Sequence, residues 1–420
     1  MRQPKKLSLT PPEAPAVGEQ QLILFYFDDT VLGPSQGAIL ALLDGLPPGK
    51  FAYRALVPTS VGPLPDALRA GGIEPDVLAM PATFREAFSS RGGIRGWSAA
   101  VLALLGYYRK LFRYFKMYNF GVVHSDGLRA HLLSIGIKVR FNVPLLWHLW
   151  AIIAPGLGLR MYCMLAAVFS DHVVTSSLYV AHQLGRSVRW RRRMSALYRG
   201  YDRTFFQLRA PAEVARPLLC ALASGENASG YKTFLLAFAQ ARRTSGELRA
   251  VVLVEGSDPA LITIIEDFGR SLKIDEFLSV QPIATSDGAR GIGPELTRRA
   301  VSVYVNASVD LAPFHSDVAE AMGMGVPVVC SRIGVLAELV VTESTGLLFT
   351  PGDARELAET LLRLLGDETL RARLTANARQ EFIARFGVEG YVAAIVRIYG
   401  EHLADVAGQD AQPAGERKVA

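Results

Sequence analysis

The chain has 420 residues, of which half are apolar and a fifth charged, so it is long enough for two globular domains and too apolar to be intrinsically disordered. Its 45 basic and 39 acidic residues leave a mild formal charge of +6, and its aromatic residues are not arranged with basic ones as a nucleic-acid surface. The three cysteines, Cys163, Cys220 and Cys330, are too far apart to pair as metal ligands. Their odd number favours a reducing, cytoplasmic location without disulfide bonds.

The first half of the chain alternates strands and helices. Residues 1–19 are rich in proline and predict a loose leader, without the apolar core and cleavage pattern of a signal peptide. The expected strands are 21–27, 51–58, 121–124 and 143–148, and the clearest expected helices are 38–46 and 64–70. Such alternation predicts an α/β domain with a parallel sheet covered by helices on both faces.

Residues 141–159 carry no formal charge over a length that approaches a membrane span. They include two prolines and two glycines, which would break a helix exposed to lipid. We therefore expect a buried strand and a loop here, and no transmembrane helix.

The alternation restarts after an arginine-rich stretch at 186–203, which predicts a second doubly wound domain. Its expected strands are 217–221, 249–254, 277–282 and 301–306, and its expected helices are 231–243 and 261–272. A long helix is expected at 391–406, followed by a disordered tail at 408–420.

The most distinctive motif follows the strand at 301–306. It consists of Glu320-Ala321-Met322-Gly323-Met324-Gly325-Val326-Pro327, then Gly346-Leu347-Leu348 and Pro351-Gly352-Asp353. Ligands of doubly wound sheets bind beyond the carboxyl ends of the strands, where the carboxylate of Glu320 could accept hydrogen bonds from ribose hydroxyls. The alternative is that Glu320 only compensates a helix dipole.

These motifs resemble the donor-binding half of the family-4 glycosyltransferases, which have the GT-B fold. Five further segments resemble landmarks of that family: Arg199-Gly200-Tyr201-Asp202, Leu253-Val254-Glu255-Gly256-Ser257-Asp258-Pro259, Gly62-Pro63-Leu64, His124-Ser125-Asp126-Gly127 and Trp147-His148-Leu149. The resemblance spans roughly residues 20–400. It implies two Rossmann-like domains facing across a cleft: an acceptor domain at 20–195, a nucleotide-sugar donor domain at 196–388, and a helix at 389–407 that crosses back to the first domain.

The activity implied is a retaining, metal-independent transfer of a sugar from a nucleotide sugar to a hydroxyl acceptor in polysaccharide or glycan assembly, without a cofactor. The acceptor would be a glycan, a lipid-linked molecule or a small molecule. By the same resemblance His148 is the catalytic candidate, with a satisfied core histidine as the alternative. The implied donor-binding residues are Glu320, Phe314, His315, Ser316, Asp317, Ser224, Ser229 and Lys232.

Three departures from the family pattern concern the donor pocket. Ala312 stands where the first of two glutamates is usual, and His315 replaces a glycine. The loop at 223–230 lacks the usual arginine and lysine, which would each contribute roughly 1.5–3 kcal/mol to binding of the donor diphosphate. His315, Lys232 or the arginines at 191–193 are candidates to compensate. The alternatives are a non-catalytic partner or scaffold of another glycosyltransferase and, less favoured, a nucleotide-sugar epimerase.

The turn that contains Gly33, Ser35 and Gly37 precedes a helix, where backbone amides can cradle an anion. The resemblance places this loop near the acceptor or the donor phosphate. A plain tight turn is the alternative.

A helix expected within 95–118 has an aromatic face next to a basic one. Its apolar face has Leu105, Tyr108, Phe112 and Phe115, and its basic face has Arg109, Arg113 and Lys116. This pattern predicts peripheral contact with an anionic surface at the inner face of the membrane. The alternative is a helix that packs on its own sheet and leaves a solvated basic edge.

Overall fold

The computed structural model describes residues 21–82, 84, 94–185, 193–201, 216–223, 230–256, 258–283 and 291–410, except for the side chains of 94–102 and 404–410. The predicted leader and half of the arginine-rich stretch, residues 186–192 and 202–203, lie outside the described residues. So do Ser224 and Ser229. Helix α16 (Val388–Asp410) extends three residues into the predicted tail, and the rest of that tail lies outside the described residues.

The first domain contains a seven-stranded sheet in the order β3-β2-β1-β4-β5-β6-β7, with every described pair parallel. Its strands are mainly continuous buried apolar runs, as a sheet covered on both faces requires. They are β1 (Gln21–Phe27), β2 (Phe51–Val57), β3 (Asp76–Val77), β4 (Phe120–Asp126), β5 (Leu145–Leu149), β6 (His172–Thr175) and β7 (Met194–Ala196).

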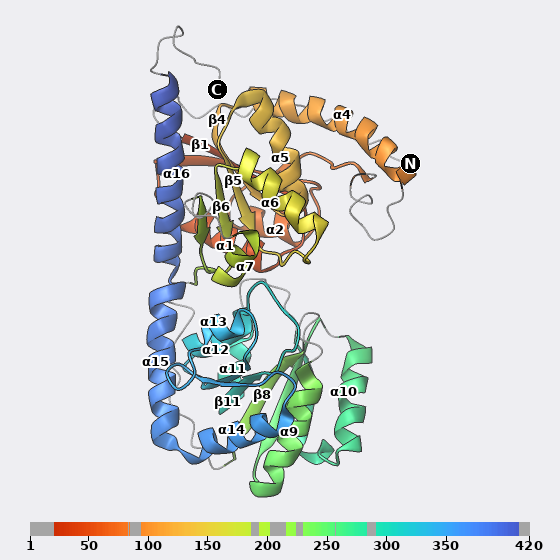
Figure 1. Ribbon diagram of the computed structural model, residues 1–420, viewed down its shortest axis with the longest axis vertical. Coiled ribbons are helices and arrows are strands. Elements are labelled where there is room, and N and C mark those ends of the chain that lie inside the picture. Colours follow the sequence, from red (N-terminus) through yellow and green to blue (C-terminus); the bar gives the residue numbers. More distant parts are fainter. Residues whose placement is uncertain are drawn as a thin grey trace.

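Helices cover both faces of this sheet (Figure 1). They are α1 (Pro34–Gly45), α2 (Pro63–Ala70), α4 (Ile94–Met117), α5 (Leu128–Phe141), α6 (Leu157–Phe169) and α7 (Leu178–Leu184). One apolar core joins α4, α5 and α6 to the sheet, and a second core joins α1, α2 and α16 to its other side.

The second domain has a parallel six-stranded sheet in the order β10-β9-β8-β11-β12-β13. The strands are β8 (Leu218–Ala223), β9 (Arg249–Glu255), β10 (Leu278–Ile283), β11 (Val303–Asn306), β12 (Val328–Ser331) and β13 (Leu347–Phe349). The helices are α9 (Gly230–Thr244), α10 (Pro259–Ser271), the 3-10 turn η2 (Asp275–Phe277), α11 (Gly293–Arg298), α12 (Ser316–Gly323), α13 (Leu336–Leu339), α14 (Ala354–Gly366) and α15 (Glu368–Phe386).

The last two helices connect the domains. Helix α15 lies along the second domain and α16 along the first, so the chain crosses between them at Gly387 (Figure 1). The linker between the domains passes this crossing: the Tyr201 amide donates to Phe386 O at 2.8 Å, and the Val388 amide donates to Tyr201 O at 3.1 Å. A Cβ at Gly200 would meet the Val388 backbone at 2.8 Å, so the linker approaches closely only because this residue is glycine.

The uncharged segment at 141–159 contains strand β5, a loop, and the start of α6 at Leu157. The expected buried strand and loop are therefore present. Across the part of the chain that the structure describes, every helix is too short or too polar to span a bilayer.

Candidate functional site

Glu320 lies on α12, behind the loop that follows β11. Its side chain is buried, and its Oε2 accepts hydrogen bonds from the backbone amides of Ile292 at 2.7 Å and Gly293 at 3.1 Å. Burial raises the pKa of this carboxyl to about 7, and Arg199 is the largest opposing influence. The backbone amides at the start of α11 thus already donate hydrogen bonds to the carboxyl group of Glu320. The binding of ribose by Glu320 stays a prediction.

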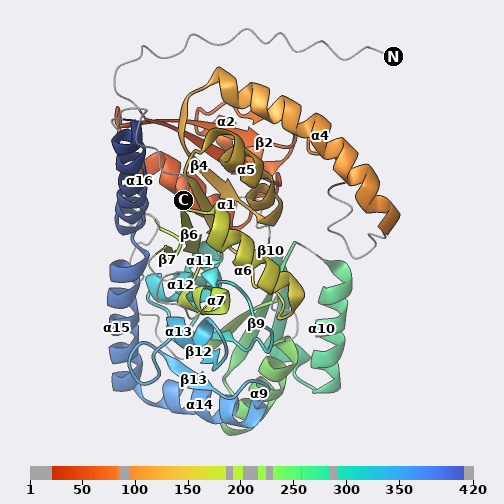
Figure 2. The same cartoon turned by 45° about the horizontal axis from the view of Figure 1, so that its top comes forward.

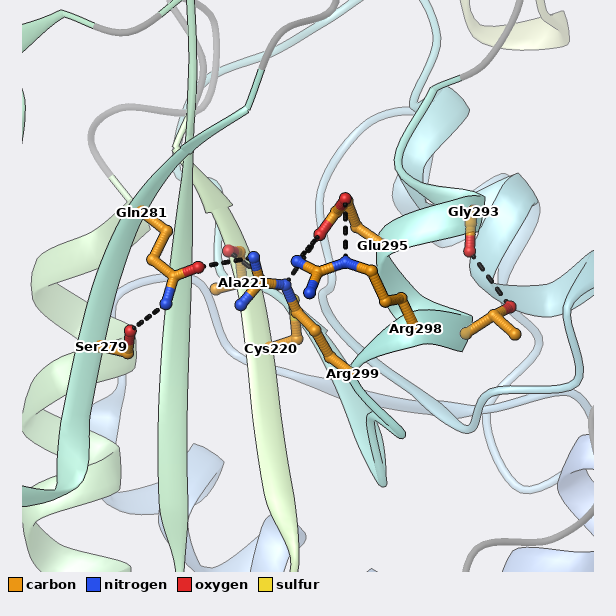
Figure 3. A network of polar contacts seen from close by, with 9 residues as sticks. Cys220, Ala221, Ser279, Gln281, Gly293, Glu295, Arg298 and Arg299 are labelled. Atoms are coloured by element: carbon orange, nitrogen blue, oxygen red, sulfur yellow. Dashed lines mark hydrogen bonds and ion pairs between the residues drawn. The ribbon is translucent and has the colours of Figure 1, made fainter.

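Gly291 makes this contact possible. Its φ is +43°, and a Cβ there would lie 2.0 Å from Glu320 Oε2. The following helix, α11, is tied to strand β10 by a polar network (Figure 3). Glu295 Oε2 accepts from Arg299 Nε at 2.9 Å, and Arg299 Nη2 donates to Gln281 Oε1 at 2.6 Å. The amides that hold Glu320 therefore belong to an anchored segment.

His315 does not point into open space but into a buried polar network. Its Nδ1 is 3.3 Å from Asn306 Nδ2, which also donates to Asp317 Oδ2 at 2.7 Å. The Tyr304 hydroxyl donates to the same Asp317 oxygen at 2.5 Å. Burial lowers the pKa of His315, with Asp317 opposing, so the imidazole is neutral near pH 7. It does not supply the cation that the loop at 223–230 lacks.

The remaining donor-side candidates are placed differently. Phe314 is buried in an aromatic cluster, with ring centroids 6.1 Å from Trp150, 6.2 Å from Tyr198 and 6.2 Å from Phe386. Ser316 is partly exposed at the start of α12. Lys232 is exposed in the first turn of α9. The structure brings Glu320, Phe314, His315, Ser316 and Asp317 onto one loop and helix and leaves Lys232 on a separate helix.

His148 is fully buried on β5 and is linked by hydrogen bonds to helix α16. Its Nδ1 is 3.1 Å from His124 Nε2, and His124 Nδ1 is 2.6 Å from the Tyr399 hydroxyl. Burial lowers the pKa of His148 to about 3 and that of His124 well below its ordinary value, so both rings are neutral.

This chain of contacts assigns the ring tautomers. A Tyr399 hydroxyl that only accepted would leave its own proton unpaired among the described residues, so we assign it as the donor to His124 Nδ1. His124 then carries its proton on Nε2 and donates to His148 Nδ1. The proton of His148 is consequently on Nε2, which is buried and has no hydrogen-bond partner within the described chain.

The Gly33–Gly37 turn uses its amides internally. The Gly33 amide donates to Gln36 Oε1 at 3.0 Å, and the Gly37 amide donates to Gly33 O at 3.0 Å. The amides of Gly33 and Gly37 are thus engaged within the turn, and the anion cradle stays a prediction. The Ser35 hydroxyl instead lies 3.3 Å from Asp126 Oδ2, at the carboxyl end of β4.

Asp126 adds a buried carboxyl next to His148, its register partner on β5. Gln36 Nε2 donates to Asp126 Oδ2 at 2.8 Å. Burial raises the pKa of this carboxyl to about 8, and neighbouring Asp28 raises it further. The Asp126 carboxyl is therefore mostly protonated at neutral pH.

The two halves meet at a set of buried polar groups. Trp150 Nε1 and the Tyr391 hydroxyl are, like His148 Nε2, buried without a hydrogen-bond partner among the residues described. The His148 ring centroid lies 5.4 Å from that of Trp150 and 6.5 Å from that of Tyr391. Three unsatisfied N–H or O–H groups in one place are unusual, because such groups are normally paired. All three can donate a hydrogen bond, which suits a ligand rich in oxygen atoms.

Arg199 is a buried cation at this junction. It opposes the rise in the pKa of Glu320 on the donor side. It likewise opposes the rise in the pKa of Tyr391, which burial causes first and Asp126 increases. Sequence reasoning treated Arg199 only as a linker residue. The available signal was its cationic side chain directly before Gly200, at the entrance to the second domain.

Comparison with known proteins agrees with this architecture. Residues 294–381 match the family model described as glycosyl transferases group 1. The HepE protein of Anabaena, solved in complex with UDP, superposes with a TM-score of 0.72 at 18% identity, over 91% of this chain and all of that one. The chain therefore has the GT-B fold, and its residues 294–381 are similar to the group 1 glycosyltransferases.

Curated relatives of this GT-B protein match over part of their length. The D-inositol 3-phosphate glycosyltransferase of Xylanimonas cellulosilytica is 30% identical over 37% of this chain and 36% of its own. The MMP alpha-(1->4)-mannosyltransferase of Mycolicibacterium hassiacum is 33% identical over 35% of this chain and 36% of its own. The matches therefore span about a third of the length of these relatives.

The segment of the group 1 match also holds the two GT-B domains together. Glu338, just before α13 ends, accepts from the backbone amides of Leu178 and Tyr179, each at 2.9 Å, and from the Tyr198 hydroxyl. The carbonyl of Pro313 accepts from the hydroxyls of Ser176 at 2.9 Å and Ser177 at 3.1 Å. These contacts hold the loop before α12 and helix α13 against the first domain.

Proposed function

We propose that the protein is a glycosyltransferase that moves a sugar from a nucleotide-sugar donor to a hydroxyl acceptor, with retention of anomeric configuration and without a metal. The observation that carries the proposal is the domain junction. There a buried carboxylate of the donor half, a buried arginine and three unpartnered hydrogen-bond donors of the acceptor half lie together. The glycosyltransferase names of the partial relatives and the UDP bound to HepE support the donor class.

Such a site would act by positioning and by electrostatic stabilisation. His148 Nε2–H can donate to a sugar or acceptor oxygen, and its depressed pKa makes it a donor of a hydrogen bond rather than a cation. Arg199 would oppose the negative charge that develops on the departing diphosphate. It is the residue of the junction best suited to offset the missing cations of the 223–230 loop.

Donor binding is the first test. Calorimetry with UDP-, GDP-, ADP- and TDP-sugars is expected to give binding with at least one of them. Arg199→Met should weaken that binding by roughly 10- to 150-fold, the equivalent of one hydrogen bond to a charged group. Arg397→Met, on an arginine whose side chain is 67% exposed, is the matched control and should bind normally. Thermal unfolding of both variants establishes that each is folded. No binding across the whole panel overturns the proposal.

The reaction itself is tested once a donor is known. Transfer should proceed in EDTA, and NMR of the product should show the anomeric configuration of the donor. Loss of activity in EDTA contradicts metal independence, and an inverted product contradicts retention. The acceptor class we propose is a glycan, a lipid-linked molecule or a small molecule of polysaccharide or glycan assembly, at the cytoplasmic side of the cell.

A second candidate is a non-catalytic partner of another glycosyltransferase. It is favoured by Ala312, which is 3% exposed, and by the backbone amides that already occupy Glu320. A folded protein that neither hydrolyses nor transfers any donor and that co-purifies with a catalytic glycosyltransferase would establish it. Conversion of a nucleotide sugar without an acceptor would instead indicate the epimerase alternative.

A further inference from the structure

Helix α6 exposes a stripe of large apolar side chains. Leu157 is 74% exposed, Met161 50%, Met164 58% and Val168 65%. Steps of four, three and four residues place all of them on one helical face. The opposite face buries Tyr162 and Ala166 in the first-domain core. The helix is therefore apolar on the side that faces away from the protein as well as on the side that packs.

The surroundings of this stripe are basic. Between 87 and 170 the sequence contains a single acidic residue, Asp126, and the structure buries it. Helices α4, α5 and α6 lie on the same side of the first sheet (Figure 2). Their exposed cations, none of which makes an ion pair with another described residue, are Arg109, Lys110, Arg113, Lys116, Arg140 and Arg160.

The structure also shows that the aromatic face of α4 is already used. Phe115 is 4% exposed, and its ring lies 4.8 Å from that of Phe141 on α5. Tyr108 packs over Gly136, where a Cβ would meet its ring at 2.3 Å. Of the residues on the predicted apolar face only Leu105 is exposed. The α4 helix thus contributes cations to the surface, and the apolar contact belongs to α6.

We infer that the α4–α5–α6 face, with the α6 stripe along one edge, docks on an anionic lipid bilayer. Apolar side chains on the same face as unpaired cations match the interface of such a membrane, where headgroups are negative and acyl chains begin just below. A second copy of the chain is a poorer occupant, because a symmetric contact would bring two cationic faces together. The inference concerns a surface outside the proposed transfer site.

Vesicle flotation without any nucleotide tests this inference. The full chain should float with phosphatidylcholine vesicles that contain phosphatidylglycerol and remain behind with pure phosphatidylcholine. Met161→Asp together with Met164→Asp should reduce binding at least tenfold. Ile264→Asp, at a 51% exposed apolar position on α10 of the second domain, is the matched control and should float normally. Arg109→Ala and Arg113→Ala should each weaken binding about fivefold, the contribution of one cation near an anionic surface.

The opposite results are equally clear. Absence of flotation with anionic vesicles at low salt overturns the inference, and so does flotation that the Met161 and Met164 changes leave intact. Sedimentation velocity tests whether a second copy of the chain binds to the stripe instead. The stripe would be assigned to a second copy if the protein self-associates, if the Met161 and Met164 changes abolish that association, and if vesicles are not bound. Donor binding is measured without vesicles, so failure of one proposal leaves the other separately testable.

Discussion

The two halves of the junction satisfy their polar groups in opposite ways. On the donor side Glu320 and Asp317 each accept two hydrogen bonds from groups of their own domain. On the acceptor side His148, Trp150 and Tyr391 bury donors that have no partner among the described residues. A ligand that enters would have to displace protein contacts on one side, whereas on the other it would supply contacts that are missing. The acceptor half is accordingly the better prepared of the two.

The largest expected effect is the pH dependence of the free energy of unfolding, to which each half contributes one buried carboxyl group. Burial raises the pKa of Asp126 to about 8 and that of Glu320 to about 7, and both are protonated more readily in the folded than in the unfolded protein. Each unit of raised pKa costs about 1.4 kcal/mol once the group must ionise. The free energy of unfolding should therefore fall as pH rises from the ordinary carboxyl range, and level off above pH 8.

Chemical unfolding between pH 7 and 9 measures the upper end of this decline, where His148, with a pKa lowered to about 3, is neutral. Asp126→Asn should flatten the decline more than Glu320→Gln does. Asp66→Asn, at a side chain that is 73% exposed, should leave the decline as it is. An equal decline in the wild type and in both buried variants would contradict the assignment of these two carboxyls.

The next effect concerns the contact that closes the donor half. Gly291→Ala would place a Cβ 2.0 Å from a Glu320 oxygen at a φ of +43°. It should displace the carboxylate from its amides and destabilise the fold by on the order of 3 kcal/mol, combining backbone strain with loss of charged hydrogen bonds. Gly72→Ala has a similar φ of +79° and nothing within 4 Å, so it should cost only about 1 kcal/mol.

Urea unfolding compares the two glycine variants. Equal losses would mean that the close approach to Glu320 is unimportant. If the Gly291 variant instead binds a nucleotide sugar more tightly than the wild type, the amides of the segment before α11 compete with the ligand for Glu320. That result would sharpen the contrast between an occupied donor half and an unoccupied acceptor half.

Local pattern predicted much of this architecture. Continuous apolar runs located β1, β2 and β9 closely, because strands buried on both faces need them. The motif around Glu320 was correctly expected on a helix after a strand. The contacts of Glu320 with Ile292 and Gly293 were not, since no periodicity relates a carboxylate to backbone amides of a distant loop. The short strands β3, β7 and β13 were also missed, because they carry too few residues for a pattern.

The smallest expected effect tests how the acceptor half is prepared. Tyr399→Phe removes one buried hydrogen bond, which should lower the free energy of unfolding by only about 1 kcal/mol. The same change frees His124 to carry its proton on Nδ1, so that His148 is no longer held with its proton on Nε2. Nitrogen-15 NMR of the imidazoles should show a single Nε2–H form of His148 in the wild type and a mixture in the variant.

Phe51→Leu is the control. The Phe51 ring packs against the same tyrosine ring at 5.8 Å but is not part of the hydrogen bonds from Tyr399 through His124 to His148, so this change should leave the tautomer unchanged. If His148 keeps one tautomer in both variants, helix α16 only covers the sheet; if Tyr399→Phe alone releases it, the helix that joins the two domains also sets the hydrogen-bond donor at their junction.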